Sequence, residues 1–191
     1  MGVRTIDGKC FTDMLVCGAS VLSAHTAELN SLNVFPVADG DTGTNMLRTM
    51  EGGLAGLRET DTADIGELAD RFTRHVLLSA RGNSGVILSQ IFGGINEGLA
   101  GHACVTATQL ADAYRQGIVK SYAAVQNPTE GTILTGFRES TEYAADRVDD
   151  TSSVQDFYRL HLDAARESLS RTKDLLPVLA ESDVIDSGAA G

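Results

Sequence analysis

Tryptophan is absent from this chain of 191 residues, which also contains only three cysteines and three prolines. The cysteines show no Cys-x-x-Cys spacing, which argues against a disulfide framework or a zinc site and favours free thiols in a reducing compartment. No stretch is long and apolar enough to span a membrane, and the N-terminus lacks the apolar region of a signal peptide. We therefore expect a cytoplasmic protein that does not insert into a membrane.

Positive charge is scarce as well, because 15 Lys and Arg residues stand against 26 Asp and Glu residues, for a formal net charge of −11. Nucleic acids and anionic membranes bind through a basic surface that displaces counterions, so we expect no nucleic-acid partner. An acidic protein still binds a polyanion locally when metal ions and backbone N–H groups neutralise the ligand.

Strand signals are nearly absent, whereas apolar residues recur with a period near 3.6 along most of the chain. This pattern predicts an all-α bundle or barrel, and no composition shift divides residues 1–191 into more than one domain. Seven helices are expected. Their predicted starts are marked by Asp7, by the loops at residues 42–45 and 82–85, by the capping pairs Asp64 with Glu67 and Thr106 with Gln109, by a position near Thr129, and by one near Ser152 with Gln155 three residues on.

The end of the sequence, residues 186–191, has the pattern of a further helix start with no helix behind it. We expect from this pattern that the chain is the N-terminal fragment of a longer multidomain protein.

Four loops of small and hydroxyl-bearing residues precede helices, at residues 39–45, 81–85, 127–132 and 186–188. A helix N-terminus presents unpaired N–H groups and a partial positive charge, which suit a phosphate group. One such loop is usually only a helix cap. Four of them in one helical chain favour a phosphate-binding site.

The first loop also carries two carboxylates, Asp39 and Asp41, separated by a single glycine. Two carboxylates so close repel each other unless a cation lies between them, and hard oxygen ligands suit Mg²⁺. A solvated acidic turn is the simpler alternative. A calcium-binding EF-hand is excluded by spacing, because Thr44 occupies the required glycine position and Met50 the required glutamate position.

Common nucleotide motifs are missing, since the chain has no Gly-x-Gly and its one Gly-Lys pair lacks the upstream glycine of a P-loop. No Ser/His/Asp or Cys/His arrangement follows from spacing, so no catalytic residue or general base is assigned. His161 lies between charged neighbours and is expected at the surface.

The segment at residues 32–46 resembles the signature of the dihydroxyacetone kinase L-domain superfamily. Within it, the sequence is most similar to the N-terminal ATP-binding domain of the fatty acid kinase A subunit. Supporting matches follow in order at residues 79–90, 128–134 and 184–188, so the resemblance covers nearly the whole chain.

The resemblance implies an eight-helix antiparallel barrel that binds ATP and two Mg²⁺ ions. Asp39 and Asp41 match the metal-binding aspartates, and Asn33 stands where related domains have a further aspartate. Thr42 replaces a histidine of those relatives, and Arg171 or Lys173 could face the phosphates. The positions matching nucleotide-contacting segments are Thr42, Gly43, Thr44, Asn45, Asn83, Ser84, Gly85, Thr129, Thr132, Asp186, Ser187 and Gly188.

The activity implied by the resemblance is transfer of the γ-phosphoryl group of ATP to the carboxylate of a fatty acid, for phospholipid metabolism. The fatty acid would be presented by a separate lipid-loaded fatty acid-binding protein that contacts downstream domains. Two alternatives stay open: a dihydroxyacetone-type small-molecule kinase subunit, against which Thr42 and the segment from Asn33 to Pro36 argue, and a non-catalytic nucleotide-sensing module.

Overall fold

The computed structural model describes residues 2–58 and 60–191, which are mostly helical, so the predicted all-α class is confirmed. None of the described helices is long and apolar enough to cross a membrane. The elements in these residues are β1 (Thr5–Asp7), α1 (Gly8–Ser31), α2 (Thr42–Ala55), α3 (Ile65–Ser79), α4 (Gly82–Leu99), β2 (Cys104–Thr106), α5 (Ala107–Ala123), α6 (Ile133–Ala145), α7 (Val154–Ser170), α8 (Thr172–Leu175), α9 (Pro177–Glu181) and α10 (Ser187–Ala190).

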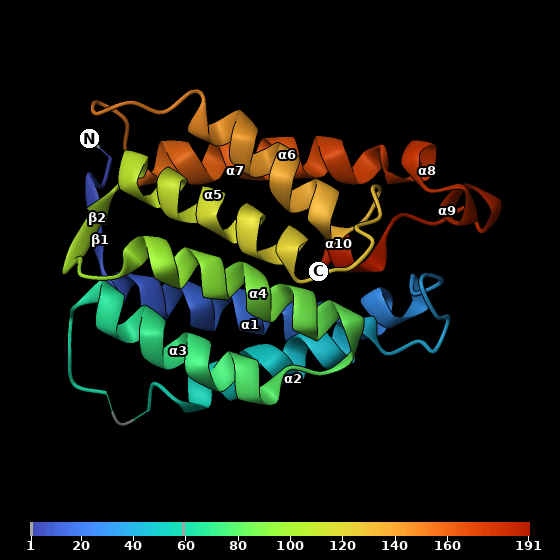
Figure 1. Cartoon of the computed structure of the whole chain (residues 1–191), viewed down its shortest axis with the longest axis horizontal. Coiled ribbons are helices and arrows are strands. Elements are labelled where there is room, and N and C mark those ends of the chain that lie inside the picture. Colours follow the sequence, from blue (N-terminus) through green and yellow to red (C-terminus); the bar gives the residue numbers. More distant parts are fainter. Residues whose placement is uncertain (1, 59) are drawn as a thin grey trace.

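The seven long helices of the described residues, α1 to α7, lie side by side in alternating directions (Figure 1). Helices α1 to α4 form one half of the bundle and α5 to α7 the other, with α4 against α5 at the junction. The short helix α10 lies where a helix start was predicted, and it packs against α1, α2 and α6. It thereby brings the last described residues next to the first helices.

The junction between α4 and α5 is a close backbone contact. A Cβ atom added to Gly94 would overlap the carbonyl oxygen of Gln116, and one added to Gly98 would overlap the Cα atom of Ala113. Glycine at these two positions lets the helices approach closely, and this contact holds the two halves of the bundle together.

Helices α1, α3, α5 and α7 begin at the same end of the molecule, beside the two strands (Figure 1). The side chains of Asp7, Asp64 and Thr106 each accept a hydrogen bond from a first-turn N–H group, as the sequence predicts. The fourth cap differs by one residue: Ser153, not Ser152, caps α7, with Asp156 as the reciprocal partner. All four N-termini at this end are therefore closed by a side chain of the chain itself.

Two other local predictions were wrong. Helix α6 begins at Ile133, with Thr132 as its cap, rather than near Thr129. The strands β1 and β2, which the sequence did not indicate, pair antiparallel with buried Ile6 opposite buried Val105. Three residues are too few to show the alternating pattern by which a strand is recognised.

His161 is only partly exposed and its ring packs among aromatic side chains, contrary to the predicted surface position. Its ring lies among Tyr114, Phe137 and Phe157, and its Nε2 atom is 3.2 Å from the hydroxyl oxygen of Ser140. Burial lowers the pKa of His161 to about 4, so its ring is neutral at pH 7. The aromatic cluster therefore packs around an uncharged ring between α5, α6 and α7.

Candidate functional site

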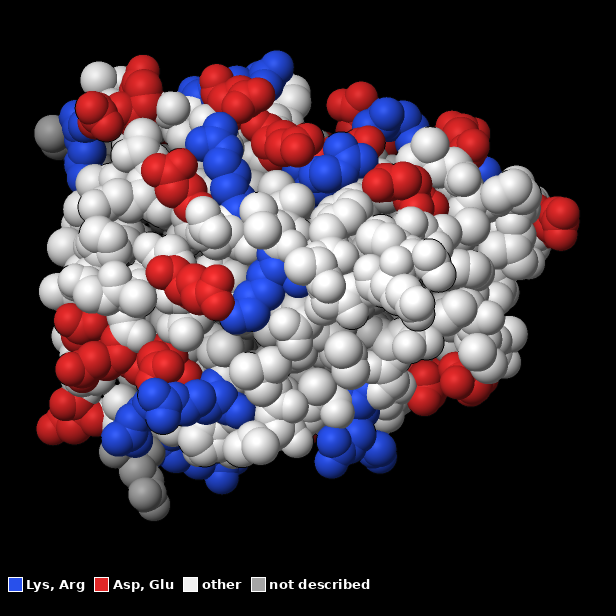
Figure 2. All heavy atoms as spheres, in the orientation of Figure 1, with Lys and Arg blue, Asp and Glu red and all other residues white. Residues whose placement is uncertain are grey.

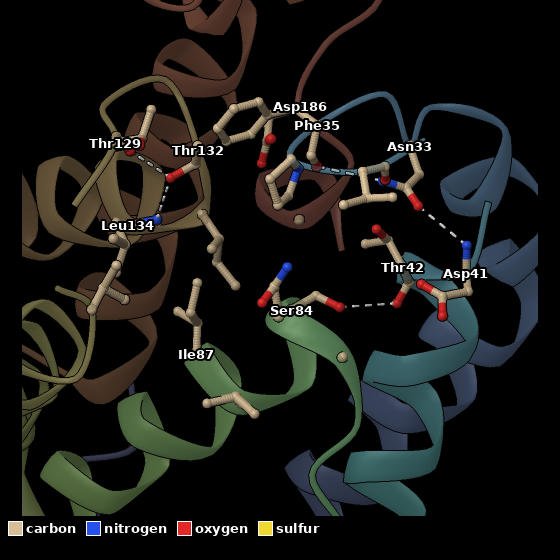
Figure 3. A pocket seen from close by; sticks show the side chains of 18 of the residues that line it. Asn33, Phe35, Asp41, Thr42, Ser84, Ile87, Thr129, Thr132, Leu134 and Asp186 are labelled. Carbon is tan, nitrogen blue, oxygen red and sulfur yellow. Dashed lines mark hydrogen bonds between the residues drawn. The ribbon is translucent and has the colours of Figure 1, made fainter. Parts of the chain in front are cut away.

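A cavity of about 710 Å³ opens at the end of the molecule opposite the strands. This volume lies within the range of small-molecule binding sites. The cavity is lined by the α1–α2 loop, the first turns of α2 and α4, the α5–α6 loop at residues 124–132, the start of α6, and the start of α10. Figure 3 shows side chains from all of these segments around one central space.

Helices α2 and α4 are the two long helices of the described residues that have no side-chain cap. The residue before α2 is Asp41 and the residue before α4 is Arg81, and neither side chain bonds to the first turn. The first N–H groups of a helix have no partner within the helix. At α2, the N–H group of Thr44 donates to the side chain of Asn30, whereas those of Thr42 and Gly43 stay open to a ligand. The first-turn N–H groups of α4 stay open as well, and a helix N-terminus favours an anion.

The buried side chain of Asn33 shapes the loop before α2. Its Oδ1 atom accepts a hydrogen bond from the backbone N–H of Asp41 at 3.2 Å, and its Nδ2 atom donates to the carbonyl oxygen of Val37 at 3.0 Å. Asp39, which is exposed, and Asp41, which is partly buried, both line the cavity. The Asn33 oxygen has one lone pair left, so its predicted metal contact would be additional to its role in the loop.

Thr42 lines the cavity, whereas the rest of the predicted segment at residues 42–45 faces neighbouring helices. Thr44 exchanges two hydrogen bonds with Asn30 of α1, at 3.1 Å through its backbone N–H group and at 2.9 Å through its hydroxyl group. A Cβ atom on Gly43 would lie 2.6 Å from the carbonyl oxygen of Thr26. Gly43 and Thr44 thus fix α2 against α1.

At the start of α4, too, some motif residues line the cavity and others pack against a neighbouring helix. Asn83 and Ser84 line the cavity, and the Ser84 hydroxyl lies 3.5 Å from the carbonyl oxygen of Thr42. Behind them, a Cβ atom on Gly85 would overlap the Thr49 hydroxyl, and the buried side chain of Asn45 lies against Gly82. Asn45 and Gly85 therefore bring the open N-termini of α2 and α4 together rather than face the cavity themselves.

The opposite wall carries two threonines of the predicted set. The Thr132 hydroxyl donates to the carbonyl oxygen of Thr129 at 2.8 Å, and both residues line the cavity (Figure 3). This bond keeps the end of the α5–α6 loop turned toward the central space.

Asp186 lies deep in the same wall, with 5% of its surface exposed. Its Oδ2 atom accepts a hydrogen bond from the backbone N–H of Ala189 at 2.7 Å, and backbone N–H groups of Ile133 and Gly188 also act on the carboxyl. Burial is the strongest influence and raises the pKa of Asp186 to about 6, against the lowering by these donors. Gly188 also lines the cavity, whereas the Ser187 hydroxyl turns away and donates to the carbonyl oxygen of Leu29 at 2.6 Å.

An apolar wall was not predicted from the sequence. Its residues come from loops and first turns, where isolated apolar positions look like ordinary core positions. They are Phe35, Pro36, Val37, Val86, Ile87, Ala124, Val125, Ile133 and Leu134. Only the folded arrangement shows that these side chains share one space with the polar residues.

The two cations considered for phosphate contact lie elsewhere. Arg171 pairs with Glu139 at 2.7 Å and Lys173 pairs with Asp183 at 2.7 Å, and neither lines the cavity. Among the described residues, no lysine or arginine lines this space. Figure 2 shows one face of the molecule. On this face, charged side chains of both signs gather over the strand end and along the edges of the view. The middle of the cavity end is uncharged.

Metal-binding capacity rests on few protein ligands. Among the described residues, no group of three or more His, Cys, Asp and Glu side chains could hold a metal ion. Asp39 and Asp41 nevertheless offer hard oxygen atoms at the cavity wall, and Mg²⁺ commonly takes its remaining ligands from water and substrate phosphates. The residues present therefore fit a Mg²⁺ ion that arrives with a phosphate ligand.

The family model described as "DAK2 domain" matches residues 36–191. The chain is 43% identical over 189 residues to an uncharacterized protein of Staphylococcus saprophyticus and 40% identical over 191 residues to Protein YloV of Bacillus subtilis. These matches cover 99% and 100% of this chain, which spans about a third (34%) of the length of either relative. The chain belongs to the DAK2-domain family, the dihydroxyacetone kinase L-domain family. This family is a family of kinase domains.

Proposed function

We propose that this chain is the Mg-ATP-binding domain of a kinase that transfers the γ-phosphoryl group to a fatty acid carboxylate. The observation that carries the proposal is the pairing of two uncapped helix N-termini with two aspartates around one cavity. Open N–H groups favour phosphate oxygens, and paired carboxylates favour a divalent cation. Mg-ATP supplies both partners in one ligand.

The charge of the cavity supports the metal as part of the ligand. The titratable side chains in its described lining are Asp39, Asp41 and Asp186, so a bare ATP anion would meet negative charge and no cationic side chain. A Mg²⁺ ion, when bound, would supply positive charge that offsets the negative charge of the phosphates during transfer. Asp39 and Asp41 would hold the ion, with Asn33 as an additional oxygen ligand.

The chain's own groups would position the phosphates. The open N–H groups at the starts of α2 and α4 would donate to phosphate oxygens. The side chains of Thr42, Asn83 and Ser84 would add donors at the same place. The apolar wall offers the surface that an aromatic base requires. Phosphoryl transfer depends mostly on such positioning and on neutralised charge.

A carboxylate acceptor also suits the side chains of the cavity. A fatty acid carboxylate is already ionised near neutral pH, whereas a hydroxyl acceptor such as dihydroxyacetone must lose a proton to a general base. No histidine or lysine is among the described lining residues, so the candidates for such a base are the aspartates, chiefly Asp186 with its pKa of about 6. The acceptor and its lipid-binding carrier are proposed for the whole protein, of which this chain is the nucleotide-binding part.

Calorimetric titration tests the nucleotide half of the proposal. Wild-type protein should bind ATP only when Mg²⁺ is present, and Asp41→Ala should abolish that binding without lowering the unfolding temperature. Asp13→Ala, an exposed carboxylate on α1, is the matched control and should bind as wild type does. A wild-type protein that shows no Mg-dependent binding would end the kinase interpretation.

Acceptor assays test the other half on the whole protein. Lipid-loaded fatty acid-binding protein should yield an acyl phosphate that hydroxylamine traps, and dihydroxyacetone should yield no phosphorylated product. Intact Mg-ATP binding with neither product would favour the nucleotide-sensing module.

A further inference from the structure

The α5–α6 loop is held from outside the cavity by a set of polar side chains that the proposed site does not use. Tyr122 is on α5, Glu130 is in the loop, and Arg138 is on α6. We call these three residues the Glu130 clamp. Each of them touches the other two, so the clamp joins the loop to both flanking helices.

Glu130 is the centre of the clamp. Its Oε1 atom accepts from the Tyr122 hydroxyl at 3.0 Å, and its Oε2 atom accepts from the Arg138 guanidinium at 3.0 Å and from the Thr135 hydroxyl at 2.6 Å. The Arg138 Nε atom in turn donates to the Tyr122 hydroxyl at 3.0 Å. Charge-assisted hydrogen bonds from a planar guanidinium fix geometry as well as distance.

The clamp reaches the loop backbone through Thr135. The Thr135 hydroxyl accepts from the backbone N–H of Gly131 at 2.8 Å while it donates to Glu130. Gly131 has a φ of +83°, which side-chain-bearing residues rarely adopt, so this bond fixes the loop at its sharpest point. The neighbouring Thr129 and Thr132 then face the cavity.

The position of Glu130 separates this role from simple packing. Its side chain is 47% exposed and lies outside the cavity lining, so it neither fills the core nor touches a ligand there. Most exposed ion pairs contribute little to stability. A residue that accepts three hydrogen bonds at such a position has a larger effect on the loop than on the whole fold.

We propose that Glu130 is a positioning residue for the nucleotide, holding Thr129 and Thr132 in their binding geometry through Thr135, Tyr122 and Arg138. The inference rests on the proposed Mg-ATP function and adds a determinant of affinity that lies outside the cavity. A loop held in its binding conformation loses less conformational entropy when the ligand binds.

The test measures Mg-ATP affinity by calorimetry, well below the unfolding temperature, together with thermal unfolding. We expect Glu130→Ala to weaken binding roughly tenfold and Glu130→Gln, which keeps an acceptor for Thr135, about threefold, with little change in unfolding temperature. Glu142→Gln is the matched control, because Glu142 lies 3.5 Å from the same guanidinium but does not touch the loop. It should bind as wild type does.

The outcomes separate the two proposals. If wild type binds Mg-ATP and Glu130→Ala binds equally well, the positioning role is wrong while the proposed function stands. An equal loss of Mg-ATP affinity in Glu142→Gln would also overturn the positioning role, because it would show that the affinity depends on surface charge near Arg138 and not on the loop. A wild-type protein that does not bind Mg-ATP would overturn both.

Discussion

The two ends of the helix bundle use the same kinds of residue in opposite ways. At the strand end, Asp7, Asp64, Thr106 and Ser153 each close the N-terminus of their own helix. At the cavity end, Thr132 and Asp186 cap α6 and α10, but α2 and α4 begin without a cap from the residue that precedes them. The caps at the strand end therefore contribute stability, whereas the starts of α2 and α4 at the cavity end leave several N–H groups without a side-chain acceptor.

The buried carboxyl of Asp186, at the cavity end, should have the largest effect on how stability depends on pH. With a folded-state pKa of about 6, Asp186 stays protonated in the fold between about pH 4 and pH 6, where the unfolded chain ionises. Unfolding then releases a proton, so stability from this group is present below about pH 4 and roughly 3 kcal/mol is lost as pH rises to about 6. Chemical denaturation of ligand-free Asp186→Asn across this range should lack that loss. An unchanged pH profile would show that Asp186 ionises normally.

His161 should act in the opposite direction and by a similar amount. Its folded-state pKa of about 4 lies below the ordinary value, so the unfolded chain binds a proton that the fold excludes. Stability from this group is present above about pH 6.5, and roughly 3 kcal/mol is lost as pH falls to about 4. His161→Gln should reduce this acid sensitivity when its denaturation is compared with wild type at pH 7 and pH 4.5. A wild-type dependence retained in full would contradict the burial of a neutral ring.

Removing a cap at the strand end should affect stability alone. In the wild-type chain, the backbone N–H of Glu67 donates to the Oδ1 atom of Asp64 at 3.0 Å. Asp64→Ala removes this acceptor and should lower the free energy of unfolding by about 1 kcal/mol. The affinity for Mg-ATP should not change, because the cavity is at the other end of the molecule. A loss of affinity in a stably folded Asp64→Ala protein would break the distinction between the two ends.

Adding a cap at the cavity end should have the converse effect. Arg81 precedes α4 in extended conformation, and Arg81→Ser places a hydroxyl acceptor there, which should raise stability by about 0.5 to 1 kcal/mol. The same hydroxyl would compete for the N–H groups proposed to bind phosphate, so Mg-ATP affinity should fall several-fold. Arg81→Ala removes the guanidinium without adding an acceptor and serves as the control. Equal affinities of the serine and alanine variants would show that these N–H groups do not bind the nucleotide.

The sequence predicted the parts of the fold that depend on neighbours along the chain. The caps at Asp7, Asp64 and Thr106 were recognised because each acts within three residues. The start of α7 was misplaced because Ser152 and Ser153 are both able to cap a helix, and the choice depends on contacts distant in sequence. One such contact is made by Gln155, which accepts a hydrogen bond from the backbone N–H of Val3 at 2.7 Å.

The candidate site shows the same limit. Ten of the predicted positions line one cavity, namely Asn33, Asp39, Asp41, Thr42, Asn83, Ser84, Thr129, Thr132, Asp186 and Gly188. Gly43, Thr44, Asn45, Gly85 and Ser187 belong to the same motifs but face other helices. A motif is a segment of sequence, whereas a cavity takes only the residues of that segment that point toward it. Glu130 and several residues of the apolar wall lie inside the matched segments, but their roles were not predicted, because long-range packing brings their partners together.

The most direct test of the account is a calorimetric titration of the wild-type chain with ATP, with and without Mg²⁺. The described cavity lining has three aspartates and no lysine or arginine, so the proposed ATP binding would depend on the metal and on the open helix N-termini. Omitting Mg²⁺ should therefore weaken ATP binding by at least about a hundredfold. Equal affinity with and without Mg²⁺ would contradict the account, because the aspartates would then have no ion to hold.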